Sequence, residues 1–358
     1  MDDALREKVR EWRDKRYDFV LLKYPQSETI TAVLISSVEM AKTVNELKGV
    51  NAAFVFAPFS IDHHPIKIFH SKVIQSFEFR KHEKNRINDD VLHPSTPDKD
   101  YRLLFRNYVS ELNKGEAEKL VLARKKEICS DVDFLDLFLD ACSEYPDSMV
   151  YLLQSADTGI RLGASPELLV EGNTTQMHTV ALAGTMRCDN DRPVAFSEWS
   201  EKNKQEQALV ADYIRNCIRN VAMPKDEWGP YICKTGNLAH IKTDFYFILS
   251  TDKLAEFLVE LPPTPAVCGV PKEKAIKFIN TQEADGRGYY SGFFGWYEPR
   301  KTTRLYVNLR CLHAESPSRV QLFAGGGILQ SSDLESEWME TELKMQTLLS
   351  LPSFQKQI

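Results

Sequence analysis

Three consecutive glycines, Gly325–Gly327, constrain the fold of this chain more than any other stretch. A short apolar run precedes them, and a polar turn separates them from a helical pattern. Glycine lets the backbone approach a ligand closely with its N–H groups unobstructed, which suits an anion such as a carboxylate. We therefore expect the glycines to form an anion cradle, although a plain strand-to-helix turn would show the same pattern.

The segment after the glycines predicts a helix with three charged residues on one face. Glu337, Glu340 and Lys344 are spaced by three and four residues, and residues so spaced are neighbours on a helix surface. Two carboxylates one turn apart suit a hard divalent cation such as Mg²⁺. The alternative is an ordinary surface ion pair between Glu340 and Lys344. Together with the glycines, the pattern favours a site for a carboxylate substrate beside a metal.

Composition excludes several classes of protein. The chain has 358 residues and a formal net charge of −6, so it offers no basic surface for general binding of nucleic acid. Its N-terminus is too charged for a signal peptide, and no apolar run approaches the ~18 residues of a membrane span. The seven cysteines are scattered and never spaced as C-x-x-C, which predicts neither a disulfide framework nor a zinc site. We expect a cytoplasmic protein with no membrane partner.

Hydrophobic patterning predicts an α+β fold of mostly antiparallel β-sheets packed together, with helices outside. We expect a single domain over residues 1–358, in which residues 1–100 are a diverged β-rich portion, 86–100 a linker or long loop, and 100–350 the portion that carries the chemistry. The expected helices cover residues 3–16, 99–114 and 198–220. The expected strands cover residues 18–23, 29–35, 52–56, 66–69, 120–126, 149–155, 161–171, 176–183, 290–297, 304–313 and 320–324.

Four charged residues break the apolar pattern of these elements. The apolar stripe of helix 198–220 extends back to Glu206, and a carboxylate on a buried face must be paired, hydrogen-bonded or metal-bound. Lys119 begins a strand, and Glu167 lies behind a proline among apolar residues. Arg310 interrupts a half-buried strand, where an arginine generally has a carboxylate partner. Ordinary solvated positions remain the alternative for Lys119, Glu167 and Glu206.

A series of short stretches resembles the chorismate-utilising enzymes, and among these most closely the isochorismate synthases. The stretches occur in the order typical of the family and cover roughly residues 100 to 350. They are KLVLAR (119–124), GASPELL (163–169), ALAGTMR (181–187), EKNKQEQALV (201–210), LAHI (238–241), PPTPAVCGVP (262–271), YYSGFFGW (289–296), LRC (309–311), LFAGGGI (322–328) and SEWMETELK (336–344).

The resemblance implies a role for each matching residue. Lys119 is similar to the general base of the family and Glu167 to its general acid. The implied Mg²⁺ ligands are Glu206 and Glu340, with Glu337 behind them or bridging through water. The implied substrate contacts are Arg310, Lys344, Tyr290, Gly325 and Gly326 for the enolpyruvyl carboxylate, and His240, Gly184 and Thr185 for the ring carboxylate.

The reaction implied by the resemblance needs an acid and a base on opposite sides of a ring. Converting chorismate to isochorismate adds water at C2 and expels the C4 hydroxyl. One group takes a proton from the water while another gives a proton to the departing hydroxyl. Lys119 can act as the base only when neutral, and Glu167 as the acid only when protonated, which an apolar wall favours. Mg²⁺ would hold the ring carboxylate.

Positions that differ between family members separate the alternatives. Anthranilate and aminodeoxychorismate synthases have Gln where Lys119 stands and use ammonia from a glutaminase partner, so Lys119 favours water and no glutaminase subunit. Ala183 stands where aminodeoxychorismate synthases have a nucleophilic lysine. Salicylate synthase shares the base but tends to have Thr where Ala266 stands. A catalytically silent chorismate-binding protein is the remaining alternative, and the intact Lys119 and Glu167 count against it.

The sequence also departs from the family pattern. Asn203 stands where relatives have an acidic residue three positions before the metal ligand, so one carboxylate near the metal is missing. The first 100 residues match weakly, and we expect a trimmed N-terminal half within one domain. We also expect a monomer, because neither a glutaminase partner nor an obvious hydrophobic helix face is implied. The product would serve menaquinone or catechol siderophore synthesis, depending on the neighbouring genes.

Overall fold

Runs of strands separated by helices build one continuous sheet in the described residues. The computed structural model describes residues 3–81, 95–188, 195–235, 238–283, 286–316 and 318–355. The strands are β1 (Phe19–Lys23), β2 (Thr29–Ala41), β3 (Ala53–Ala57), β4 (Ile66–Glu78), β5 (Lys119–Cys129), β6 (Met149–Ser155), β7 (Gly159–Ser165), β8 (Leu168–Asn173), β9 (Gln176–Arg187), β10 (Met223–Thr235), β11 (Leu238–Ile248), β12 (Gly269–Val270), β13 (Phe293–Tyr297), β14 (Thr303–Val307), β15 (Cys311–Ser316) and β16 (Arg319–Ile328).

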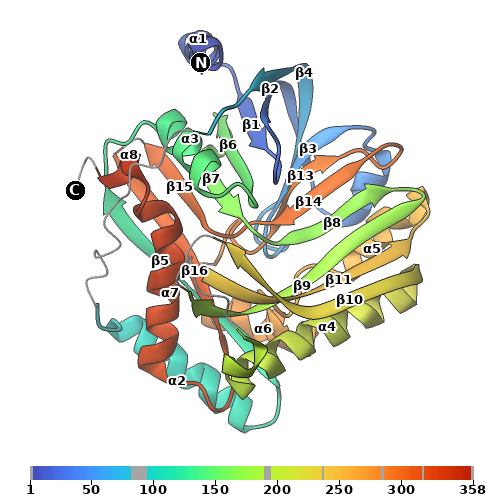
Figure 1. The fold of residues 1–358 in the computed structure, drawn as a ribbon, viewed down its shortest axis with the longest axis vertical. Helices are drawn as coiled ribbons and strands as arrows, with labels where there is room; N and C mark the ends of the chain where they lie inside the picture. The colour runs from blue at the N-terminus through green and yellow to red at the C-terminus, as the bar shows by residue number, and fades with distance from the viewer. Residues whose placement is uncertain are drawn as a thin grey trace.

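Helices flank this sheet (Figure 1). They are α1 (Asp3–Asp14), α2 (Lys99–Asn113), α3 (Phe134–Glu144), α4 (Glu201–Val221), α5 (Leu254–Glu260), α6 (Lys272–Gln282), α7 (Leu334–Leu349) and α8 (Pro352–Gln355), with short 3₁₀ turns η1 (Val44–Gly49), η2 (Phe196–Glu198) and η3 (Thr251–Lys253). None of the helices described is long and apolar enough to cross a membrane.

The strands form one antiparallel sheet, as the patterning predicted. The sheet has 16 strands in the order β10-β11-β9-β8-β14-β13-β3-β4-β2-β1-β6-β7-β15-β16-β5-β12. Every strand pair in the described ranges runs antiparallel. The expected α+β class with antiparallel strands and outer helices is therefore confirmed.

Successive residues of the inner strands enter different hydrophobic clusters. In β1, Phe19 and Leu21 belong to a cluster shared with α3, whereas Val20 belongs to a cluster that also takes Phe54 and Phe56 from β3. The residues that alternate with these phenylalanines in β3 are Ala53, Val55 and Ala57. They belong to a third cluster, which also contains residues of α4 and α5. A side-chain period of two produces this separation. The sheet thus has helices on its outer sides and an aromatic-rich cluster inside.

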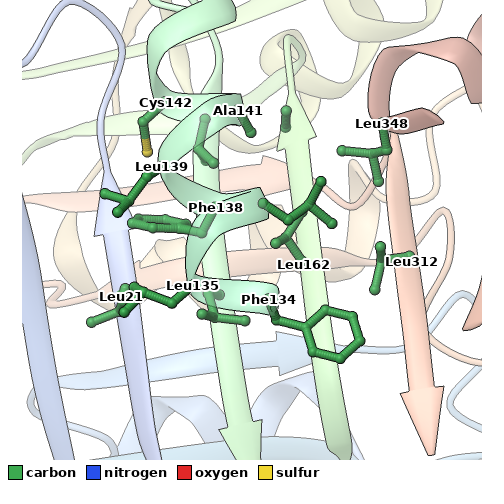
Figure 2. Close-up of a cluster of buried hydrophobic side chains, with 14 of the residues drawn as sticks. Leu21, Phe134, Leu135, Phe138, Leu139, Ala141, Cys142, Leu162, Leu312 and Leu348 are labelled. Atoms are coloured by element: carbon green, nitrogen blue, oxygen red, sulfur yellow. The ribbon is translucent and has the colours of Figure 1, made fainter. Parts of the chain in front are cut away.

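Helix α3 shows how one helix covers the sheet (Figure 2). The Asp133 side chain caps its N-terminus by accepting a hydrogen bond of 2.7 Å from the backbone N–H of Leu135. Phe138 and its neighbours then pack onto Leu162 of β7 and Leu312 of β15. Burying each such side chain contributes about 1.5–3 kcal/mol. The helix therefore holds strands from distant parts of the chain in one layer.

The N-terminal strands lie inside the sheet. β1 pairs with β6 through Phe19 and Gln154, and β3 pairs with β13 through Phe56 and Phe294. The portion expected to be diverged is therefore part of the same sheet as the rest of the chain. Most of the linker expected at 86–100 lies outside the described residues, because 82–94 are not among them.

Three expectations about strands were wrong. The strand expected at 161–171 is split into β7 and β8 around Pro166, which cannot donate to a strand ladder. The strand expected at 304–313 is split into β14 and β15 at Arg310, whose φ is 48°. Patterning also missed the hairpin of β10 and β11, since Pro224 and Pro230 interrupt β10. Bulges accompany both prolines in the β10 ladder.

Candidate active site

One cavity gathers segments that are far apart in the sequence. Its walls come from strands β5, β9, β11 and β16, helices α4 and α7, and the connections between other elements. The lining residues are Val121, Pro166, Glu167, Leu182, Ala183, Gly184, Thr185, Glu206, His240, Ala266, Val267, Tyr290, Leu309, Arg310, Phe323, Ala324, Gly325 and Lys344.

Most residues implied by the resemblance line this cavity, and four do not. Lys119 and Glu337 are buried behind the wall, with 0% and 2% of their surface exposed. Gly326 lies in β16 beside the lining residue Gly325. Glu340 lines an adjoining outer hollow, which shares Thr185 with the main cavity.

Glu167 is a buried carboxyl at the turn between β7 and β8. The Ser165 hydroxyl donates to the Val307 carbonyl oxygen at 2.6 Å and accepts from the Glu167 N–H at 3.4 Å, which fixes the turn. Burial raises the pKa of Glu167 to about 8, against the opposing charges of Lys119 and Lys344. The carboxyl is therefore protonated at neutral pH, as a general acid must be.

Lys119 lies behind Glu206 and contacts it. The Lys119 Nζ is 2.9 Å from Glu206 Oε1, an ion pair whose angles lie outside those of a hydrogen bond. Burial opposes ionisation of Glu206, but Lys119, Lys202 and Lys344 together outweigh it, and the pKa of Glu206 is lowered. Gly327 makes room for the pair, because a Cβ there would lie 2.2 Å from Glu206 Oε1 and 2.9 Å from Lys119 Cε. A side chain at Gly327 would force the pair apart.

The three glycines continue strand β16, which excludes the alternative of a plain strand-to-helix turn. Gly325–Gly327 belong to β16 and pair residue by residue with β5, and α7 begins only at Leu334. Pairing of β16 with β15 ends at Leu322, which leaves the second edge of the glycine run without a strand partner in the described residues. A Cβ on Gly325 would lie 3.0 Å from the Tyr290 hydroxyl. The glycines thus let neighbouring side chains approach the strand.

Acidic and basic side chains alternate where α4 meets α7. The Lys202 Nζ is 2.5 Å from Glu337 Oε1, and the Lys344 Nζ is 2.6 Å from Glu340 Oε1. Burial disfavours the charge on Lys202, yet Glu337, Glu206 and Glu340 together raise the pKa of Lys202. The carboxylates of the two helices therefore converge on a common region, and each is paired with a lysine.

The donors in this region fit a divalent cation in their chemistry. Carboxylate oxygens are the ligands that Mg²⁺ takes from proteins. Glu337 Oε2 is buried without a hydrogen-bond partner among the described residues. Burial and the charge of Glu340 raise the pKa of Glu337, a strain that a cation would relieve. Within the described part of the chain, however, no three Asp, Glu, His or Cys side chains are grouped closely enough to hold one ion.

Arg310 is a buried cation without a carboxylate. Arg310 is only 8% exposed, and its Nη1 has no hydrogen-bond partner in the ranges described. No ion pair joins Arg310 to a protein carboxylate in these ranges, and the substrate carboxylate that the resemblance implies as its partner stays a prediction. Its φ of 48° lies in a region that residues with a Cβ rarely adopt. An unpaired buried charge is costly, so this position suits an anion supplied from outside, with Lys344 as a second cation on the wall.

His240 presents an unprotonated nitrogen to the cavity. Burial, with a contribution from Arg310, lowers the pKa of His240 to about 3, so the ring is neutral. The Nδ1 lies 3.0 Å from the Gly184 carbonyl oxygen, which assigns the proton to Nδ1. The Nε2 is then an acceptor, and it is buried without a partner among the residues described. Such a nitrogen suits a hydroxyl donor better than a carboxylate.

Other expected substrate contacts lie around His240 and across the cavity. Gly184 has a φ of 74°, and a Cβ there would lie 3.3 Å from Asn203. The Thr185 Oγ1 is 3.4 Å from His240 Nδ1. Tyr290 stacks on Phe323 with ring centroids 5.6 Å apart. These contacts fix the shape of the cavity, and the roles of the residues toward a substrate stay predictions.

Sequence reasoning missed three residues of the site. Lys202 lies one helical turn before Glu206, so the spacing of four residues was an available signal. Thr264 is 3% exposed and contributes to holding down the pKa of Glu167. Phe323 precedes the glycines and was assigned only to an apolar run. No local signal marked Thr264 or Phe323 as lining or supporting a cavity.

Comparison with known proteins decides the family. The family model described as Chorismate binding enzyme matches residues 55–351. The chain belongs to this family. The match begins within β3, so it leaves out α1, β1 and β2 and includes part of the portion expected to be diverged.

The relatives that this chain resembles in sequence are named for different reactions. Isochorismate synthase EntC of Escherichia coli (strain K12) is 30% identical over 248 residues, which are 66% of this chain and 62% of EntC. Anthranilate synthase component 1 2 of Haloarcula marismortui is 30% identical over 277 residues, which are 74% of this chain and 51% of that protein. The chain thus spans about three fifths of the length of EntC.

A solved structure has the same fold. MenF, the menaquinone-specific isochorismate synthase from Escherichia coli, matches with a TM-score of 0.75 at 21% identity, over 93% of this chain and 88% of MenF. The chain therefore has the fold of MenF along nearly its whole length.

Proposed function

We propose that this protein is a Mg²⁺-dependent isochorismate synthase, which isomerises chorismate by adding water at C2 and expelling the C4 hydroxyl. The observation that carries the proposal is a protonated buried acid, Glu167, in the same cavity as the unpaired cation Arg310. Chorismate carries two carboxylates, and Arg310 and Lys344 offer two cations to receive an anion. The similarity to EntC supports the same reaction.

Lys119 and Glu167 would divide the proton transfers between them. Lys119, which is ion-paired with Glu206 in the structure, would first have to release its proton and would then, as a neutral amine, take a proton from the water that attacks C2. Glu167 gives its proton to the C4 hydroxyl, which leaves as water. One water is consumed and one is released, so the reaction is an isomerisation. Positioned acid–base groups of this kind contribute about 10²–10⁴-fold each.

Glu206, Glu337 and Glu340 are the residues that would hold Mg²⁺. Lys119 engages Oε1 of Glu206, and the Oε2 of Glu337 has no partner among the described residues, so acceptor oxygens remain for a cation. When bound, Mg²⁺ would hold the ring carboxylate and stabilise charge pushed onto the ring as the hydroxyl leaves. The neutral His240 would accept a hydrogen bond from a substrate hydroxyl at Nε2.

Individual residues favour this reaction over those of sibling enzymes, because overall identity to EntC and to the anthranilate synthase component is equal. Lys119 favours water as the nucleophile, and so no glutaminase partner is needed. Ala183 lines the cavity and cannot form a covalent adduct. Ala266 also lines it, where a threonine would favour elimination of pyruvate.

The product profile tests the proposal directly. The protein is incubated with chorismate, with and without Mg²⁺, and the mixture is separated by chromatography. Isochorismate that forms only with Mg²⁺ is the expected result. Absence of isochorismate would contradict the proposal, and salicylate with free pyruvate would identify a salicylate synthase instead.

One observation favours a second candidate, a silent chorismate-binding protein. Lys119 does not line the cavity and lies behind Glu206. Substitution Lys119→Ala separates the candidates, because for an enzyme it should abolish turnover while leaving chorismate binding roughly intact. Equal inactivity of the wild type and the variant, with binding by both, would establish the silent protein.

A further inference from the structure

Another buried ion pair, between Arg287 and Glu283, lies next to the cavity without lining it. Arg287 is only 5% exposed. It donates from Nε to Glu283 Oε2 and from Nη2 to Glu283 Oε1, both at 2.6 Å. Glu283 Oε1 also accepts from the Tyr108 hydroxyl at 2.7 Å and from the Ala123 N–H at 3.1 Å. Both charges are therefore held by partners of fixed position.

The remaining donors of Arg287 go to two backbone carbonyls on the cavity wall. Its Nη1 donates to the Val267 oxygen at 2.7 Å, and its Nη2 donates to the Val121 oxygen at 2.5 Å. Both valines line the cavity. Val121 follows Lys119 by two residues in β5, and Val267 follows Ala266 directly. The guanidinium of Arg287 thus connects strand β5, which carries the expected base Lys119, to the segment of the cavity wall that contains Ala266.

A short strand ladder joins the same two segments beside the guanidinium. The short strand β12 pairs with β5 through Gly269 and Val270, and the Val121 N–H donates to the Cys268 oxygen at 2.7 Å. Arg287 crosses the end of this small ladder, with its guanidinium 4.4 Å from the centre of the Phe59 ring. Lysine could not replace it, because an ammonium has no planar fork that reaches a carboxylate and two carbonyls together.

We propose that Arg287 is a positioning residue for the isochorismate synthase reaction. It sets the strand of Lys119 against the wall at Ala266 through the Val121 and Val267 carbonyls. This inference rests on the proposed function. Loosening the clamp would displace Lys119 from the attacking water and let the wall at Ala266 move, and small displacements of a catalytic group lower turnover strongly.

The substitution Arg287→Lys keeps the charge for Glu283 and removes the fork. We expect kcat to fall at least about tenfold while KM for chorismate stays within about threefold, because Arg310 and Lys344 lie on other elements. The ratio of pyruvate to isochorismate among the products should rise, and the backbone amides of 119–123 and 264–270 should exchange hydrogen faster. Faster exchange confined to these two segments, together with a changed product ratio, would not follow from a general loss of stability.

Arg215→Lys is the matched control. Arg215 holds Glu227 through hydrogen bonds of 2.9 and 2.6 Å, but the pair is exposed and belongs to neither of the segments 119–123 and 264–270. Its kcat, KM and product ratio should stay within about twofold of the wild type.

Four outcomes would overturn the inference. These are an Arg287→Lys variant with wild-type kcat and product ratio, a loss of the same size in Arg215→Lys, unchanged hydrogen exchange in both segments, and a wild type that forms no isochorismate. The last outcome refutes the proposed function as well, whereas the others leave it intact. If Arg287→Lys does not fold, Glu283→Gln replaces it, since an amide offers the fork one acceptor in place of two. A Glu283→Gln variant with an unchanged product ratio would also refute the proposal.

Discussion

The buried ion pairs at the cavity and the one formed by Arg287 are built in different ways. At the cavity, Lys119 and Lys202 each contact a single carboxylate in the ion pairs described. Arg287 makes four hydrogen bonds, two of them to Glu283. An ammonium is a point charge on a flexible stem, whereas a guanidinium holds its partners in one plane.

Unpartnered atoms show what this difference means. Glu337 Oε2, Arg310 Nη1 and His240 Nε2 are all buried at or beside the cavity without hydrogen-bond partners among the described residues. No atom of Arg287 or Glu283 is in that condition within the same ranges. The lysine pairs can therefore exchange their partners for a cation or substrate, while the Arg287 pair holds the surrounding backbone in place.

Removing the carboxylate of Glu283 should have the largest effect on stability. Glu283→Ala would leave Arg287 buried without its counter-charge and would orphan the Tyr108 hydroxyl and the Ala123 N–H. Breaking a buried pair in this way costs about 3–5 kcal/mol. Urea unfolding of the variant and the wild type measures the change in the free energy of unfolding. Glu227→Ala, which breaks the exposed pair with Arg215, should cost less than about 1 kcal/mol; equal costs would remove the distinction.

The next effect in size concerns Glu167, which is kept neutral by burial. Glu167→Gln cannot donate a proton, so kcat should fall by about 10²–10⁴-fold. Because burial raises the pKa of Glu167 to about 8, the acid is protonated below that pH and ionised above it. Wild-type kcat should therefore decline as the pH rises through about 8. A kcat–pH profile from pH 6 to 9.5 measures this, and a variant that keeps the same decline would show that another group titrates.

A substitution of Lys202 tests whether the lysine pairs at the cavity can exchange their partners for a cation. Lys202→Met removes a positive charge that faces Glu337, Glu206 and Glu340, and the proposed divalent cation would no longer compete with it. We expect Mn²⁺ to bind at least about tenfold more tightly, because opposite charges a few ångströms apart attract strongly near a protein surface. Electron paramagnetic resonance of Mn²⁺ titrations measures the affinity without requiring turnover.

Lys204→Met is the control for Lys202. Lys204 lies on the same helix and pairs at 2.7 Å with Glu201, whose side chain is 89% exposed. Its loss should leave Mn²⁺ affinity unchanged. Weaker or equal binding by the Lys202 variant would show that Lys202 does not occupy the place of a cation.

The smallest expected effect is that of the Tyr108 hydroxyl. Tyr108→Phe removes one hydrogen bond of 2.7 Å to Glu283 and leaves all four hydrogen bonds of Arg287 in place. The free energy of unfolding should fall by about 1 kcal/mol, measured by urea unfolding. We expect kcat to stay within about twofold. A large loss of kcat at unchanged stability would show that Tyr108 takes part in the reaction and does not only support Glu283.

Local sequence patterns predicted where strands lie along the chain better than which strands pair with one another in the sheet. Side-chain periodicity placed β1 and β3, because it depends on residues two positions apart. It could not show that β3 pairs with β13, since Phe56 and Phe294 are brought together only by the complete sheet. The strand expected at 320–324 stopped short of the glycines, because glycine is depleted in strands, and the close approach of Glu206 to Gly327 became visible only in the structure.

The site was predictable where charge conflicted with burial. Glu206 on an apolar stripe and Glu167 among apolar residues both proved buried, at 7% and 3% exposure. Arg310 was found by the same reasoning, but the missing carboxylate was not, because a pattern does not show what fills a cavity. Arg287 was missed altogether, since its position between two glycines reads as a loop and its partners lie in distant segments.

The inner position of β3 has a consequence for how this chain reaches its native state. Phe54 and Phe56 are synthesised early, yet the strand that covers their free edge, β13, follows more than two hundred residues later. Contacts so distant along the chain require loop closure before they contribute any stability, which makes folding slow. During synthesis the nascent N-terminal strands expose an open, aromatic edge, and they depend on protection from aggregation until the last quarter of the polypeptide arrives.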